Sequence, residues 1–211
     1  MIRKFAIGIP TLNRADLLQA SLDKYAIDFS DVEIFVIDNG NQELYSSDNS
    51  IIINEKRNLG VAASWNKLCQ LIFKNYDYAM ILNDDIYCGY NADVVENAIF
   101  KMKSGLVQSQ VSWSVFVISK RLYNFVGKFD EIFYPAYYED SDYLYRMKLK
   151  GIIQDVDATL NPKIKRISST YELAPDLVNN AMQQNRLRYI SKWGNSPLLE
   201  TFITPYGLQK L

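Results

Sequence analysis

The side chains best suited to chemistry in this sequence are carboxylates, because its 211 residues include no histidine. Nucleophile pairs that depend on histidine and imidazole metal ligands are therefore excluded, and proton transfer falls to carboxylates, Tyr, Lys or Cys. Acidic residues gather at Asp84 and Asp85, and again at Glu139, Asp140 and Asp142. Adjacent carboxylates suit two tasks, which are binding a divalent cation and accepting a proton as a general base.

Three clusters of polar residues follow segments that we predict to be strands. Residues 5–9 lead into Pro10, Thr11, Leu12, Asn13 and Arg14, residues 32–37 into Asp38, Asn39 and Gly40, and residues 78–82 into Asn83, Asp84 and Asp85. In an open parallel sheet ligands bind beyond the carboxyl ends of the strands, so we expect the clusters to share one crevice. Each also fits a structural interpretation: Asn13 as a helix cap, residues 38–40 as a turn, and the acids as a solvated pair.

Strand and helix patterns alternate through the first half of the chain. Apolar runs of strand length occupy residues 5–9, 32–37, 51–53 and 78–82, and helical spacing occupies 15–25, 61–73 and 92–102. The second half adds a strand at 113–118 and helices at 120–125, 140–149 and 176–192. This order predicts an α/β fold in which helices flank a mostly parallel sheet. No repeat or linker divides the sequence, so we expect a single domain over residues 1–211.

Composition narrows the class of protein further. The chain has 23 basic and 24 acidic residues and a net charge of -1, which argues against general nucleic-acid binding. No apolar run reaches the roughly 18 residues of a membrane span, and the N-terminal run is too short for a signal peptide, so we expect a cytoplasmic protein. Cys69 and Cys88 lack metal-ligand spacing and lie in apolar stretches, which predicts reduced core residues.

The polar clusters of the first half carry a resemblance to a known family. GIPTLNRADLLQASL (residues 8–22) and VIDNGN (residues 36–41) resemble the opening elements of the family 2 glycosyltransferases, which have the GT-A fold, a Rossmann-like α/β architecture. The resemblance implies that Asp38 contacts the pyrimidine ring of a bound nucleotide. It also implies that the nucleotide is lined by Pro10, Thr11 and Arg14.

Two further stretches resemble donor-binding elements of that family. NEKRNLGVAASWN (residues 54–66) implies donor contacts at Asn58 and Asn66 and a diphosphate contact at Arg57. LNDDI (residues 82–86) falls where the family keeps its D-x-D motif, which implies a nucleotide-sugar contact at Asp84 and direct binding of Mn²⁺ or Mg²⁺ by Asp85.

The metal-binding part of the resemblance departs from the family pattern in two ways. Asn83 stands at the first position of the D-x-D motif, where it would contact the donor without adding charge, and the usual histidine ligand of the second half is absent. The basic residues near the expected histidine position are Lys163, Lys165 and Arg166, which are candidates to cover the diphosphate, although a solvated basic strand explains them equally well.

The second half holds the most specific match. VGKFDEIFYPAYYEDSDYLYRMKLKG (residues 126–151) resembles the family signature that carries the catalytic base, which implies that Asp140 deprotonates the acceptor hydroxyl and that the anomeric carbon is inverted. Glu139 and Asp142 are expected to orient the sugars or Asp140, and Arg146 to pair with one of them. Burial among aromatic side chains should raise the pKa of such a carboxylate. Expected acceptor or sugar contacts are Trp113, Tyr138 and Asp142.

The resemblance therefore implies a metal-dependent, inverting transferase. It would move glucose, rhamnose or a similar hexose from a UDP-sugar to a hydroxyl of a glycan, with residues 1–105 holding the nucleotide and 106–211 the acceptor. The stretches also resemble capsid-glycan glycosyltransferase domains of large viruses that infect algae, in which case the cytoplasm is that of the host and further domains accompany this one. NRLRYISKWGNSP (residues 185–197) resembles the family's closing segment, where we expect Trp193 in the core.

Two other functions remain open at this stage. The first is a catalytically inert UDP- or glycan-binding module derived from a transferase, which is motivated by Asn83 and the absent histidine. The second is a sugar nucleotidyltransferase, which fits less well because GIPTLNR stands where that class has a glycine-rich G-x-G-T-R loop. The sequence leaves the oligomeric state open.

Overall fold

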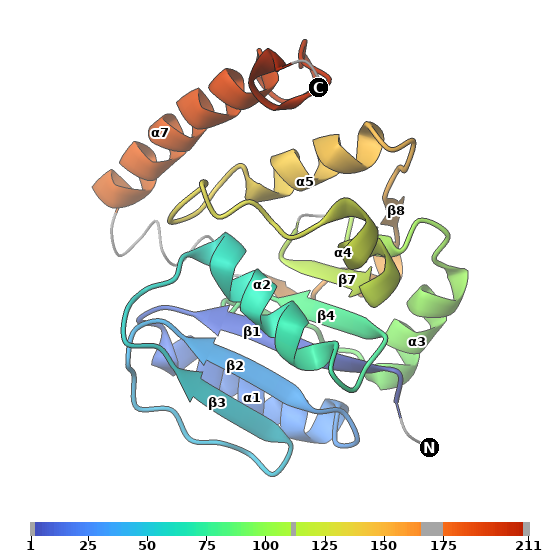
Figure 1. The fold of residues 1–211 in the computed structure, drawn as a ribbon. Coiled ribbons are helices and arrows are strands. Elements are labelled where there is room, and N and C mark those ends of the chain that lie inside the picture. Colours follow the sequence, from blue (N-terminus) through green and yellow to red (C-terminus); the bar gives the residue numbers. More distant parts are fainter. Residues whose placement is uncertain (1–2, 111–112, 166–174, 209–211) are drawn as a thin grey trace.

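A seven-stranded sheet forms the centre of the computed structural model, which describes residues 3–110, 113–165 and 175–208 (Figure 1). The strand order is β3-β2-β1-β4-β7-β6-β8. The strands are β1 (Phe5–Thr11), β2 (Ile34–Asp38), β3 (Ser50–Asn54), β4 (Tyr78–Leu82), β6 (Leu106–Gln108), β7 (Val115–Ser119) and β8 (Asp155–Val156). Neighbours are parallel, except that β7 runs antiparallel to β4 and β6. A separate two-stranded sheet pairs β5 (Ile86–Tyr87) with β9 (Ile164–Lys165).

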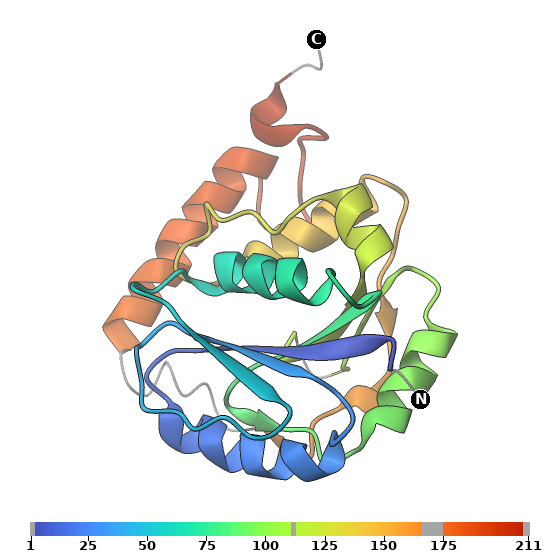
Figure 2. The ribbon, with the colours of Figure 1, turned by 60° about the horizontal axis from the view of Figure 1, so that its bottom comes forward.

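Helices cover both faces of the large sheet (Figure 2). They are α1 (Ala15–Asp28), α2 (Val61–Ile72), α3 (Ala92–Lys101), α4 (Lys120–Val126), α5 (Glu139–Lys148) and α7 (Pro175–Trp193), with short 3-10 helices η1 (Ala158–Leu160) and η2 (Pro205–Gly207). On one face, α1 and α3 join the core through Leu22 and Val95. On the other, α2, α4 and α5 do so through Leu68, Leu122 and Tyr143.

The last helix, α7, packs outside α5 rather than on the sheet (Figure 1). Its residues Tyr189 and Trp193 form a small separate core with Phe133 and Tyr145. Trp193 is 1% exposed, which confirms the expected core position.

Strand β1 is buried on both faces, as the central strand of a parallel sheet should be. Ile7 belongs to the core under α1, and Ala6 to the core under α2. Gly8 lets α2 approach closely, because a Cβ there would lie 2.9 Å from Ile81 Cδ1 and 3.1 Å from Leu68 Cβ. The carboxyl end of this strand therefore has a fixed place in the sheet.

The structure confirms the predicted fold class and the predicted long elements, with small shifts at their ends. Strands β5, β6, β8 and β9 were not predicted, because runs of two or three residues carry no periodic signal. The predicted cap at Asn13 is wrong: α1 has its N-cap at Arg14 without a side-chain hydrogen bond. Asn13 instead adopts φ of +56°, a left-handed conformation that Asn tolerates.

The structure also bears on two predictions from composition. Both cysteines are buried and free of a disulfide, as predicted. No helix in the described part of the chain is long and apolar enough to cross a membrane.

Candidate functional site

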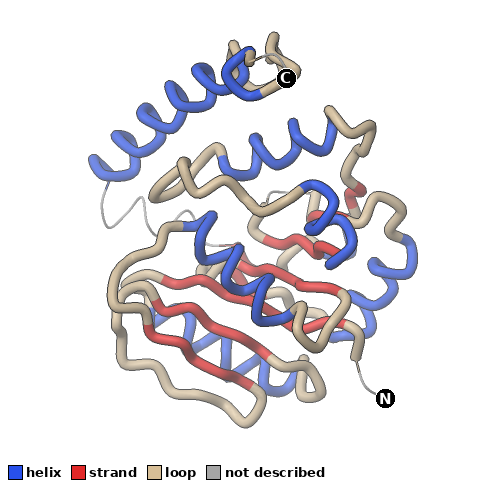
Figure 3. The backbone as a smooth tube through the Cα atoms, viewed as in Figure 1, coloured by secondary structure: helices blue, strands red, loops and turns tan. Residues whose placement is uncertain are grey.

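The three polar clusters meet at the carboxyl edge of the sheet, as the strand order predicts. Thr11 is the register partner of Asp38 across β1 and β2. From the same position the Thr11 hydroxyl donates a hydrogen bond of 2.7 Å to Oδ2 of Asp84, which follows β4. Figure 3 shows long loops at the edge where β1, β2 and β3 end. Residues at or just after the ends of three strands therefore lie together at the edge where α/β proteins bind ligands.

Asp38 lies completely buried beneath the loop that follows β2. Its Oδ1 accepts hydrogen bonds from Gly40 N at 2.8 Å and Gln42 Nε2 at 2.9 Å, and its Oδ2 accepts one from Gln42 N at 2.6 Å. The expected contact with a pyrimidine ring is therefore not open in this conformation. The sequence analysis did not predict that Gln42 would bind Asp38. A side chain with an N–H donor, four residues after the acid that ends a predicted strand, was the local signal for this contact.

Asp84 and Asp85 lie side by side in the chain after β4, both partly exposed. Burial raises the pKa of Asp84 to about 6, the hydrogen bond from Thr11 works against this rise, and the charge of Asp85 adds to it. The two acids line a small pocket of about 40 Å³ together with Lys24 and other residues of α1. Two crowded carboxylates of this kind favour a cation beside them.

A complete metal site is not formed by the protein alone within the described residues, where no group of three or more Asp, Glu, Cys or His side chains is placed to hold an ion. Asn83 is partly exposed, and its backbone N–H donates to Ser114 O at 3.0 Å. Strand β9 pairs with β5 directly after the acids, so that Lys165 lies in register with Ile86. Lys163 is exposed just before β9, and Arg166 lies outside the described residues.

The remaining residues that we predicted to contact the donor are Pro10, Arg14, Arg57 and Asn58, and they differ in exposure and in hydrogen-bond partners. Pro10 is partly exposed within β1. Arg14 pairs with Asp16 at 3.3 Å. Arg57 is exposed, and Asn58 Oδ1 accepts a hydrogen bond from Gly60 N at 2.9 Å in the turn before α2.

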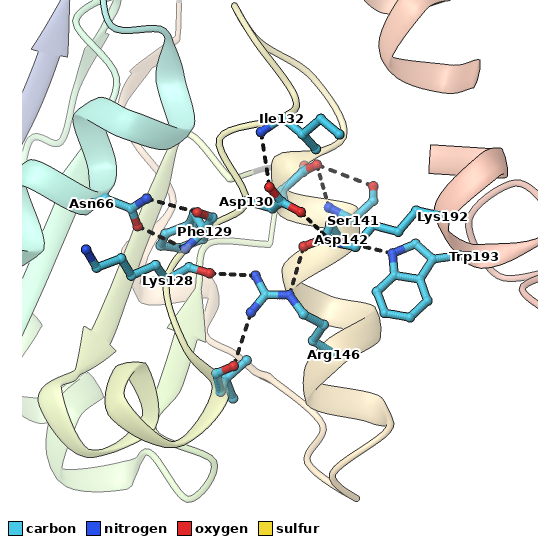
Figure 4. Close-up of polar contacts among 12 residues, drawn as sticks. Asn66, Lys128, Phe129, Asp130, Ile132, Ser141, Asp142, Arg146, Lys192 and Trp193 are labelled. Atoms are coloured by element: carbon cyan, nitrogen blue, oxygen red, sulfur yellow. Dashed lines mark hydrogen bonds and ion pairs between the residues drawn. The ribbon is translucent and has the colours of Figure 1, made fainter. Parts of the chain in front are cut away.

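Asn66 has a structural role instead of the predicted donor contact. It is 2% exposed. Its Nδ2 donates to Phe129 O at 2.9 Å, and its Oδ1 accepts from Phe129 N at 2.9 Å (Figure 4). Nδ2 also donates to Glu131 Oε1 at 2.9 Å, and Oδ1 also accepts from Tyr123 OH at 3.0 Å. All the hydrogen-bonding capacity of this amide is therefore used to hold the loop before α5.

That loop connects α5 to the carboxyl edge. Val61 N, at the start of α2, donates to Pro135 O at 2.7 Å, and a Cβ at Gly60 would lie 2.8 Å from the Tyr134 ring. α2 itself begins just beyond the end of β3. The segment that leads to Glu139 and Asp140 is thus packed against the same edge as Thr11, Asp38 and Asp84.

Glu139 and Asp140 open α5 in surroundings that disfavour their charged forms. Glu139 is 6% exposed, and Oε2 has no hydrogen-bond partner among the described residues. Burial raises its pKa to about 8, and the charge of Asp140 adds to the rise. Burial also raises the pKa of Asp140, while Ser141 opposes the rise by donating from N at 2.6 Å and from Oγ at 3.3 Å. Asp140 is the more exposed of the two, so it is the better placed to meet a substrate.

Asp142 is a buried structural carboxylate, which differs from the expected sugar contact (Figure 4). It is completely buried and accepts from Lys192 Nζ at 2.6 Å, Trp193 Nε1 at 2.9 Å and Arg146 Nε at 2.8 Å. The expected pairing of Arg146 with an acid of this segment is confirmed. The carboxylate has no exposed surface for a ligand and instead joins α5 to α7.

The aromatic residues of this region divide between core and surface. Phe133, Tyr143 and Tyr145 are buried in the core, so they offer little surface to a ligand. Tyr138 is partly exposed, with its ring 5.6 Å from that of Tyr189. Trp113 is also partly exposed and stacks on Trp65 at 6.1 Å. Tyr138 and Trp113 remain available as ligand contacts.

The raised pKa of Glu139 predicts a measurable dependence of stability on pH. The folded protein holds this proton up to about pH 8, whereas an unfolded chain releases it near the ordinary value of 4.5. Folding therefore becomes less favourable as pH rises between these values. We expect Glu139→Gln to reduce the loss of unfolding free energy between pH 5 and pH 8 by about 3 kcal/mol. Urea denaturation at pH 5 and pH 8 measures this loss in the wild type and the variant. Equal losses of unfolding free energy in the two proteins would contradict a neutral, buried Glu139.

Comparison with known proteins supports the fold assignment. No protein-family model and no curated protein sequence matches the chain. Among solved structures, the crystal structure of S. aureus TarS matches with a TM-score of 0.56 and 12% sequence identity. The match covers 89% of this chain but only 40% of the TarS chain. The fold and its polar edge define an α/β protein of the GT-A type.

Proposed function

We propose that this chain is a glycosyltransferase that uses a nucleotide-sugar donor, most simply a UDP-sugar, and transfers a hexose to a hydroxyl of a glycan. The proposal is carried by one observation: Thr11, Asp38 and Asp84 meet at the carboxyl edge of a GT-A sheet, and the segment bearing Glu139 and Asp140 packs on that edge. The fold shared with the glycosyltransferase TarS supports the same class of reaction.

The acidic pair fits a divalent cation that shares its ligands with the donor. Asp84 and Asp85 are adjacent carboxylates at the ligand edge, and oxygen ligands suit Mg²⁺ or Mn²⁺. In the described residues the protein supplies no third acid, so we propose that Asp85 binds the ion directly and that diphosphate and water oxygens complete its shell. A bound ion of this kind neutralises charge on the departing diphosphate. Lys163, just before strand β9, and Lys165, on that strand, are proposed to add positive charge.

Asp140 is proposed as the general base. It would accept the proton of the acceptor hydroxyl as the oxygen attacks the anomeric carbon opposite the diphosphate, which inverts that carbon. Its raised pKa brings a carboxylate closer to the strength that proton abstraction needs. Glu139 holds its own proton at neutral pH, so it adds no negative charge beside the base.

Calorimetric titration with UDP, with and without Mn²⁺, tests the donor and metal parts of this proposal together. We expect UDP to bind at least about tenfold more tightly with Mn²⁺, because the ion links the diphosphate to the acids. Asp85→Asn should remove most of the gain, whereas Asp48→Asn, on an exposed loop residue, should keep it. A panel of UDP- and GDP-sugars then identifies the donor by release of free nucleotide. Equal affinity with and without the ion would contradict metal dependence.

A catalytically inert nucleotide-binding module is the second candidate. It is favoured by the lack of a third acidic ligand among the described residues and by Asn83 in the acidic segment. The two candidates differ in turnover rather than in binding. UDP binding without release of sugar from any donor, in the presence of a range of glycan acceptors, would favour the inert module.

A further inference from the structure

The amide of Gln42 occupies the polar surface of the buried acid that ends β2. Nε2 donates to Asp38 Oδ1 at 2.9 Å, and the backbone N of the same residue donates to Oδ2 at 2.6 Å. With the bond from Gly40 N, Oδ1 has both of its lone pairs engaged. Asp38 has no exposed surface, so a ligand reaches this carboxylate only if the Gln42 side chain leaves.

The hydrogen-bonding groups of the Gln42 side chain are incompletely satisfied. Its Oε1 is buried and has no hydrogen-bond partner among the described residues. The second contact of Nε2, to Thr11 Oγ1, is long at 3.4 Å. A buried acceptor without a partner is costly, and it regains hydrogen bonds with water once the side chain swings out. This amide is therefore held by one strong contact and is easier to displace than a fully bonded one.

The chemistry of this amide matches that of a base edge. A primary amide presents an N–H donor beside a carbonyl acceptor, and the imide edge of uracil presents the same pair. We propose that the Gln42 amide is a built-in competitor for the base of the nucleotide, so that donor binding requires its replacement on Asp38 by a base N–H. The inference rests on the proposed function and adds to it a residue that lowers the affinity for the nucleotide.

The same exchange would leave the acidic pair in place. Thr11 keeps its 2.7 Å hydrogen bond to Asp84 whether or not Gln42 is present, because the Thr11 hydroxyl donates that bond and only accepts the long one. Displacement of Gln42 thus opens the base position without disturbing the acids at the end of β4. The competitor should act on nucleotide affinity alone.

The test compares UDP binding by the wild type with that of Gln42→Ala and Gln42→Met in the presence of Mn²⁺. Alanine removes the competitor, and methionine fills its space without a donor. We expect both variants to bind UDP about tenfold more tightly, because neither has to break the hydrogen bond from Gln42 Nε2 to Asp38 before UDP binds. Turnover at saturating donor should change less than affinity. Circular dichroism and melting curves establish that the variants are folded, and methionine keeps the packing if alanine does not.

A control separates competition from loop mobility. Gln19 fixes the same loop further along, through hydrogen bonds to Tyr45 N at 3.0 Å and Tyr45 O at 3.4 Å, without touching Asp38. Gln19→Ala should leave UDP affinity within about twofold, because it keeps the Gln42 amide in place. Equal tightening in Gln19→Ala would show that loop mobility is responsible and would overturn the proposal.

A second ligand tests whether the base edge is involved. UDP methylated at N3 lacks the imide N–H, so it should bind weakly to wild type and variants alike, and both ligands should gain by a similar factor when Gln42 is removed. Weaker UDP binding by the Gln42 variants would mean that Gln42 contacts the base directly, and unchanged binding would mean that Gln42 does not compete with the base. Either result would overturn the proposal that Gln42 is a competitor. If the wild type binds no nucleotide, the proposed function itself fails.

Discussion

Replacing Asp140 by asparagine is expected to lower the rate of sugar transfer by about a thousandfold, which is a typical contribution of a general base. The amide is nearly the same size but cannot accept the proton of the acceptor hydroxyl at neutral pH. The Asp140 carboxylate accepts hydrogen bonds from its neighbour Ser141, at the start of α5, so the change should leave UDP affinity within a few-fold. Turnover and calorimetric titration measure the two effects separately.

Ser141→Ala is the matched control for this substitution. It removes the weak 3.3 Å contact of the hydroxyl but keeps the backbone donor at 2.6 Å, so turnover should change by no more than about threefold. Because burial raises the pKa of Asp140, transfer in the wild type should rise with pH above the ordinary range of an aspartate. Near-normal turnover in Asp140→Asn would mean that another group is the base.

Replacing Lys192 by methionine is expected to lower the free energy of unfolding by about 3 kcal/mol, because Asp130 loses its cation and the buried Asp142 keeps only Arg146 as a cationic partner. The ammonium of Lys192 is 2.6 Å from both Asp130 Oδ2 and Asp142 Oδ1, and the residue is 5% exposed (Figure 4). Methionine fills much of the same volume, so the loss reports the charge rather than a cavity. Urea denaturation at pH 7 measures it.

Lys148→Met serves as the control, since Lys148 is exposed on the last turn of α5 and should contribute less than about 0.5 kcal/mol. A double variant carrying Asp142→Asn and Lys192→Met should lose less stability than the sum of the single losses, because the uncompensated charge is then absent. Additive losses, or equal effects at positions 148 and 192, would argue against a buried ion pair between α5 and α7.

The apolar pattern was sufficient to predict the main elements. Apolar runs of strand length predicted β1, β2 and β4, and helical spacing in segments such as 61–73 predicted the covering helices. These features depend on residues close together in the chain, so a single sequence contains them. The position of Asp84 at the carboxyl edge followed from the same reasoning, because parallel strands end on one side.

The roles of individual polar residues were harder to predict. Asn66 and Asp142 lie in segments that resemble ligand-binding motifs, but both are buried and fully engaged with protein partners. The partners lie far along the chain: Phe129 is 63 residues from Asn66, and Lys192 is 50 residues from Asp142. No local pattern indicates which distant donor will satisfy a buried acceptor.

The sequence by itself determined the alternation of strands and helices, the absence of histidine chemistry and the segments where carboxylates gather. Only the tertiary structure decided which of those carboxylates stay partly exposed at the sheet edge and which hold the fold together. The physical reason is that a buried polar group must find hydrogen-bond partners, and packing brings these from remote elements. Asp140 and Asp142 illustrate this: two residues apart on one helix, one stays partly exposed at its start and the other is enclosed by α7.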